Sequence, residues 1–149
     1  MPNPEAFKSR HIAFIHKMIL IMEHYSVDEQ HCNILYKVSG DKLITGEEMT
    51  WASPDLENFT MQASEEYLVI VGGDYGMQVS DRVDVSHIMD LGTLTNKPKQ
   101  GLRLQVPRSR PSVTFNLKVG HELIVVGGWT DPNSRHFANS AEFIDIKSS

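Results

Sequence analysis

Two segments, Tyr67-Leu-Val-Ile-Val-Gly-Gly73 and Glu122-Leu-Ile-Val-Val-Gly-Gly128, carry the same short apolar run followed by a glycine pair, 55 residues apart. Branched aliphatic residues favour β-strands. Glycine reaches backbone conformations that other residues adopt only at a cost, so the pair marks the point where each strand ends. A strand that recurs together with its stop signal predicts a fold built from copies of one unit.

Other strand-like runs recur around these segments and define the unit. Each diglycine strand follows one such run and precedes another, and the runs are short and separated by Gly, Pro, Asn, Asp and Ser, which indicates an all-β chain. In the first unit Leu20-Ile-Met-Glu-His24 takes the place of the diglycine strand. We expect a flexible segment at residues 1–9 and three units at approximately residues 10–56, 57–109 and 110–149. A fourth run closes the first two units, near Glu48 to Trp51 and at Leu102 to Val106.

The third unit resembles the kelch repeat. It contains Arg110-Pro-Ser-Val-Thr-Phe115, then Leu123-Ile-Val-Val-Gly-Gly128, then Asn139-Ser-Ala-Glu-Phe-Ile-Asp145. This order is similar to the kelch pattern of an arginine-led first strand, a diglycine second strand and a third strand that ends in aromatic-x-Asp. The resemblance implies blades of four antiparallel strands in a β-propeller. The alternative is that each glycine pair ends a hairpin in a β-sandwich.

Three units are few for a propeller, because closed propellers have typically four to eight blades. An open arc exposes apolar blade faces and unpaired strand edges. We therefore expect an incomplete or partial propeller. The chain is a fragment of a longer protein, or two copies close a six-blade ring, or another chain supplies the remaining blades.

Composition limits the function classes. The 149 residues are enough for one domain and carry a formal charge of −5 with no basic stripe, which argues against nucleic acid as a partner. The most apolar stretch, Ile12 to Met22, is too short and too polar to cross a membrane. A single cysteine, Cys32, predicts a reducing compartment, and we expect the cytoplasm.

The sequence predicts neither a cofactor nor a metal. No ligand spacing typical of zinc sites occurs among the seven histidines, and no phosphate-binding or nucleophile motif is present. We therefore expect a protein that is not an enzyme. The alternative is a truncated or degenerate relative of a kelch-propeller enzyme that acts on a sugar or a small hydroxylated substrate.

We predict a module that binds a protein partner through loops on one propeller face. Tyr, Trp and Arg are enriched at interface hot spots. The kelch resemblance also implies arginines at the start of first strands that bind the carboxylates of an acidic peptide. The candidate partner-binding residues are Arg10, Tyr25, Tyr75, Arg108, Arg110, Trp129, Arg135 and His136. A structural role for Arg110, in which it binds carbonyl groups of a neighbouring blade, stays open.

Overall fold

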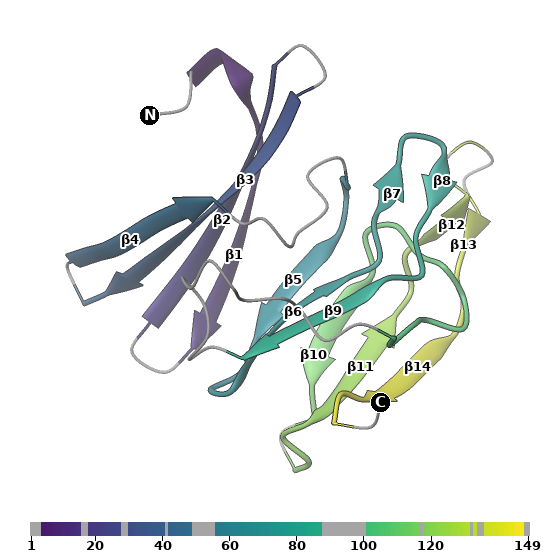
Figure 1. The fold of residues 1–149 in the computed structure, drawn as a ribbon. Coiled ribbons are helices and arrows are strands. Elements are labelled where there is room, and N and C mark those ends of the chain that lie inside the picture. The colour runs from purple at the N-terminus through teal and green to yellow at the C-terminus, as the bar shows by residue number, and fades with distance from the viewer. Residues whose placement is uncertain are drawn as a thin grey trace.

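The computed structural model describes residues 4–15, 18–27, 30–40, 42–48, 56–87, 101–116, 118–131, 133 and 136–147. Apart from a 3₁₀ turn, η1 (Pro4–Ala6), the regular elements of these residues are β-strands. The strands form several small antiparallel sheets, and the described sheets do not close into a ring (Figure 1). The predicted all-β class is thus confirmed.

The first sheet is a four-stranded meander. Its strands are β1 (Phe7–Ile15), β2 (Met18–Val27), β3 (Gln30–Ser39) and β4 (Lys42–Glu48), and neighbours in sequence are neighbours in the sheet. The strand β1 begins at Phe7, so the sheet starts earlier than the predicted unit boundary at residue 10. The fourth strand also lies earlier than predicted, and Trp51 is outside the described residues.

The middle and third sheets share one plan. The middle sheet has the order β5 (Thr60–Ala63), β6 (Tyr67–Val71), β9 (Val83–His87), and the third sheet has the order β10 (Ser112–Phe115), β11 (Glu122–Val126), β14 (Ala141–Asp145). Each contains an inserted hairpin between its second and third strands: β7 (Asp74–Tyr75) with β8 (Gln78–Val79), and β12 (Trp129–Asp131) with β13 (His136–Phe137). The predicted fourth run of the second unit pairs only through an isolated bridge between Arg82 and Arg103.

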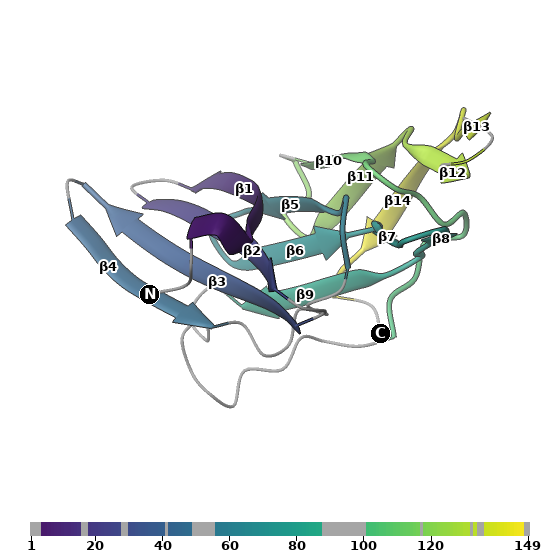
Figure 2. The ribbon, with the colours of Figure 1, turned by 90° about the horizontal axis from the view of Figure 1, so that it is seen from above.

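The three sheets stack face to face, with the middle sheet between the other two (Figures 1 and 2). Two apolar clusters fill the two interfaces. Leu68 and Ile70 of β6 belong to the cluster that is shared with the first sheet, whereas Val69 and Val71 belong to the cluster that is shared with the third. Successive side chains of a strand point to opposite faces. Both faces of β6 are buried, and this explains why the strand is apolar at every position.

The glycine pair after β6 lets consecutive units approach closely. Gly72 has a positive φ of 69°, and a Cβ at this position would lie 2.2 Å from the carbonyl oxygen of Arg108, just before β10. The Gly73 N–H donates a hydrogen bond to the same carbonyl oxygen (2.8 Å). No side chain fits at Gly72 without displacing the backbone of the next unit, so the recurring pair is a packing feature as well as a strand end.

Candidate functional site

The two inserted hairpins lie next to each other at one end of the stack, where β12 contacts β8 (Figure 1). We call the side chains of Tyr75, Met77, Trp129, His136 and Phe137 the hairpin surface. Met77 is 71% exposed and Phe137 is 64% exposed, although both are large and apolar. Large apolar side chains that are exposed close together mark interaction sites more often than isolated ones do.

Buried polar bonds hold the base of the hairpins in place. Asp74, the first residue of β7, is buried, and its Oδ2 accepts hydrogen bonds from Asn58 Nδ2 (2.9 Å) and from the Ser109 hydroxyl. Backbone bridges join Glu57 to Asp74 and Ser109 to Trp129. Each hairpin therefore grows from a backbone pairing with the segment that leads into the first strand of its own unit.

The third-unit hairpin presents an aromatic pair. The rings of Trp129 and Phe137 pack with their centroids 3.9 Å apart, and the two residues are paired across β12 and β13. His136 is exposed beside Phe137. Trp129 is only partly exposed, whereas Phe137, which packs against it, is exposed. The predicted Arg135 lies outside the described residues.

Arg110, in the segment that leads into β10, is exposed. Its backbone N–H donates to the Asn58 carbonyl oxygen (2.7 Å), and its Nε donates to Asn58 Oδ1 (3.0 Å). Both residues have a positive φ, 51° for Arg110 and 55° for Asn58, in the left-handed region that residues other than glycine rarely adopt. These contacts orient the guanidinium group and leave it accessible to solvent.

Arg108 has a different role from the one predicted, because its side chain is fully buried. The guanidinium group binds Glu142 Oε2 through Nε (3.2 Å) and Nη2 (2.9 Å), and its Nη1 donates to the carbonyl oxygens of Gly127 and Ser140. No surface is left on which a partner could reach this group. The internal role that the sequence left open for Arg110 is thus occupied by Arg108, and Arg110 is the exposed one.

Arg10 and Tyr25 belong to a separate cluster on the first sheet. Both bind the carboxylate of Glu23, Arg10 through Nη2 (2.6 Å) and Tyr25 through its hydroxyl group. Arg10 also lies over the ring of Phe7, with its Cζ 5.4 Å from the ring centroid. The hydrogen bond from Tyr25, together with Arg10, lowers the pKa of the Glu23 carboxyl. The structure therefore divides the predicted residues between this cluster and the hairpin surface.

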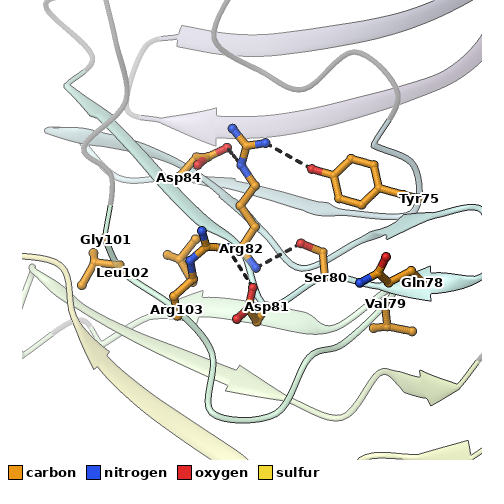
Figure 3. A pocket seen from close by; sticks show the side chains of 11 residues that line it. Tyr75, Gln78, Val79, Ser80, Asp81, Arg82, Asp84, Gly101, Leu102 and Arg103 are labelled. Atoms are coloured by element: carbon orange, nitrogen blue, oxygen red, sulfur yellow. Dashed lines mark hydrogen bonds and ion pairs between the residues drawn. The ribbon is translucent and has the colours of Figure 1, made fainter.

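A polar recess of about 460 Å³ lies beside the β7–β8 hairpin and is also lined by residues 80–84 and 101–103 (Figure 3). Within it the Arg82 Nε lies 2.6 Å from Asp84 Oδ2, and Arg82 Nη1 donates to the Tyr75 hydroxyl (3.2 Å). Arg103 pairs with Asp81 at 2.9 Å near the opening. Burial raises the pKa of the Asp84 carboxyl, and Arg82 partly offsets this effect.

The charges of the recess balance each other, so it is not built to attract an ion of one sign. Asp84 pairs with Ile70 in the middle sheet as Glu142 pairs with Val125 in the third sheet, so the two carboxylates are equivalent. In the third sheet, Glu142 accepts hydrogen bonds from the backbone N–H groups of Gln105 and Val106 and from Arg108. The equivalent carboxylate thus serves to bind one unit to the next.

Metal-ligating side chains do not gather within the described part of the chain, where no group of three or more His, Cys, Asp or Glu residues is placed to hold an ion. His11 illustrates what the histidines do instead. Its ring stacks on Phe59 of the next unit with the centroids 4.0 Å apart. Burial, with a smaller effect of the nearby His24, lowers the pKa of His11 to about 4.

The comparisons with known proteins identify no family. No protein-family model matches the chain, and no curated protein matches its sequence. Among the described residues, no helix has the length and apolar character that crossing a membrane requires.

Sequence reasoning missed the buried acidic residues Asp74 and Glu142. Glu142 fixes Arg108, and Asp74 fixes the hairpin base. A signal for Glu142 was available, because Asp84 and Glu142 both lie between apolar or small residues in the third strands of successive units. An acidic residue that recurs on an inward-facing position predicts a buried partner for it.

Proposed function

We propose that this chain is a kelch-like protein-interaction module and that its hairpin surface, together with Arg110, binds an acidic peptide segment of a protein partner. In this proposal the three stacked sheets are blades of a partial β-propeller. The observation that carries the proposal is the pair of adjacent hairpins that expose Met77 and Phe137, together with the exposed Arg110 that follows the bridge between Ser109 and Trp129.

The chemistry of this surface suits a peptide with both apolar and acidic side chains. Phe137, supported by Trp129, offers a broad apolar contact, and such aromatic residues dominate the binding energy of many interfaces. Arg110 is held through its Nε, so the terminal nitrogen atoms of its guanidinium group point a fork toward an incoming carboxylate. The exposed His136 adds a polar group at the rim, whereas the Tyr75 hydroxyl accepts a hydrogen bond from Arg82.

A random peptide library displayed on phage tests the proposal. We expect the selected peptides to be enriched in Asp or Glu next to an aromatic or aliphatic residue. Their affinity, measured by fluorescence anisotropy, should fall at least about tenfold for Phe137→Ala and for Arg110→Ala, since each substitution removes a central contact worth about 1.4 kcal/mol or more. The effect of Arg110→Ala should shrink at high salt, because the lost contact is a charge pair near the surface.

The matched control is Val119→Ser. Val119 is also apolar and 38% exposed, but it lies in the turn between β10 and β11, whereas the β12–β13 hairpin follows the opposite end of β11. Peptides that bind this variant and the unchanged chain alike, and lose affinity only for the hairpin variants, support the proposal. A library that yields no enriched peptide, or peptides that bind all variants equally, would contradict it.

A further inference from the structure

The first and third sheets, at the two ends of the stack, each leave one face exposed. The equivalent faces of the middle sheet are buried. We call the face of a sheet that looks toward the preceding unit its upstream face, and the other its downstream face. The downstream face of the middle sheet carries Val69, Val71 and Val85, which are 0%, 0% and 4% exposed. The strand pairing places Ile124, Val126 and Phe143 at the equivalent positions of the third sheet.

This equivalent downstream face of the third sheet is open to solvent. Val126 is 47% exposed and Phe143 is 66% exposed. The first glycine of the pair shows the same contrast: a Cβ on Gly72 would meet the next unit, whereas no atom of the described chain lies within 4 Å of a Cβ built on Gly127. The third sheet thus has the side chains and the glycine of an interface that the described residues do not complete.

The first sheet exposes the complementary upstream face. Leu20 and Met22 of β2 are buried toward the middle sheet, so Ile19 and Ile21 lie on the other face of the same strand. On β1 this face includes Ile12, which is 49% exposed, and Phe14, which is 70% exposed. The equivalent residues of β5, Met61 and Ala63, are buried in the interface between the first and middle sheets.

The same pair of equivalent positions is in contact at both internal interfaces, and it predicts the register of a third interface. His11 of β1 stacks on Phe59, one residue before β5, and Thr60 of β5 donates a hydrogen bond to the carbonyl oxygen of Pro111, one residue before β10. His11, Thr60 and Ser112 are equivalent, because each pairs with the same position of the second strand in its sheet, Met22, Val71 and Val126. By the same step Ser112 would contact the residue equivalent to Phe59 and Pro111 in a first sheet, which is Arg10.

We infer that two copies of this chain associate head to tail, with the downstream face of each third sheet covering the upstream face of the other copy's first sheet. A two-fold axis then forms this interface twice and closes a ring of six sheets, which lies within the usual range of four to eight blades. Gln62 Nε2 donates to the Val113 carbonyl oxygen (3.3 Å) at the internal interface. Thr114 is its equivalent, and it would donate to the carbonyl oxygen of Ile12 in the second copy.

The association state in solution tests the inference, measured by sedimentation velocity over a range of protein concentrations. We expect a species of twice the 16.8 kDa chain mass. Phe143→Asp on the downstream face and Phe14→Asp on the upstream face should each weaken the dimer at least about tenfold, because each places a charge in an apolar contact. Ser112→Ala with Thr114→Ala, a milder change on exposed positions, should weaken it less and in the same direction.

Mixing the two Asp variants distinguishes a head-to-tail dimer from a symmetric one. A mixed pair retains one intact interface, formed by the upstream face of Phe143→Asp and the downstream face of Phe14→Asp, so association should partly return. Met77→Asp on the hairpin surface should leave the dimer unchanged, which separates this inference from the proposed binding function. Circular dichroism confirms that each variant is folded.

Three results would overturn the inference. A monomer at every concentration would mean that another sheet, from a longer chain or a different protein, covers these faces. A dimer that survives either Asp variant would show that like faces pair. A mass above that of two chains would show that the ring does not close with six sheets.

Discussion

Replacing Arg108 by methionine should cost more stability than any other single arginine substitution in the described chain. Its guanidinium group is fully buried and binds Glu142, which is itself only 9% exposed, together with the carbonyl oxygens of Gly127 and Ser140. Removing one partner of a buried ion pair leaves an uncompensated charge and costs about 3–5 kcal/mol. Methionine keeps much of the aliphatic volume, so the loss measures the polar network rather than a cavity.

Urea unfolding at a fixed protein concentration measures this loss. The matched control is Arg110→Met, because Arg110 lies two residues away but is exposed, and its substitution should change the free energy of unfolding by about 1 kcal/mol or less. Adding Glu142→Gln to Arg108→Met should restore about 1–3 kcal/mol. The amide oxygen can still accept from the Gln105 N–H, while the unpaired charge is gone.

An Arg108→Met variant within about 1 kcal/mol of the unchanged chain would refute the reasoning, because a buried pair broken on one side cannot cost so little. Equal losses for Arg108→Met and Arg110→Met would refute it as well. Either result would mean that the segment before β10 does not pack on β14 as described.

Two further predictions concern the packing between units. Gly72→Ala should destabilise the chain by about 2–5 kcal/mol in urea unfolding, since it adds a clash with the Arg108 carbonyl to the strain of a positive φ. The control Gly76→Ala has a similar φ of 64° but no neighbouring atoms of the described chain within reach, and it should cost only about 1–2 kcal/mol. Equal costs for the two variants would contradict the close approach at Gly72. The free energy of unfolding should fall as the pH drops from about 6.5 to about 4, because the unfolded His11 binds a proton in this window and the folded one, with its pKa of about 4, does not. The fall due to His11 is at most about 3 kcal/mol and should be absent in His11→Phe. If that variant keeps the pH profile of the unsubstituted chain, His11 is not buried against Phe59.

The strands were predictable where the unit repeats, because the signal is then read more than once. Val69 and Val71 recur as Ile124 and Val126, and the structure places both runs in second strands of equivalent sheets. The first unit lacks the glycines, yet its second strand was located by position, and His24 at the glycine position is buried with Nδ1 2.8 Å from Asn33 Oδ1. The position that glycine takes in the later units is thus occupied here by a buried side chain with a hydrogen-bond partner.

The arginines could not be assigned from sequence, because exposure depends on which unit covers which residue. Arg108 and Arg110 lie two residues apart in the same loop, and local pattern gives no reason to bury one and expose the other. The distinction comes from Glu142, a residue of the third strand more than thirty positions away, and from the left-handed φ of Arg110 that directs its side chain outward. Contacts of this separation are set by the stacking of sheets.

The thiol reactivity of two equivalent positions tests most directly the claim that one unit repeats through the stack and that its last downstream face is covered by a second copy. Val71→Cys and Val126→Cys are compared in a Cys32→Ser background by the rate of labelling with a thiol reagent. We predict that Val71→Cys is protected at every protein concentration, and that Val126→Cys is labelled rapidly when dilute and becomes protected as the concentration rises. Equal reactivity of the two positions when dilute would contradict the stacked arrangement, and labelling of Val126→Cys that does not depend on concentration would contradict the second copy.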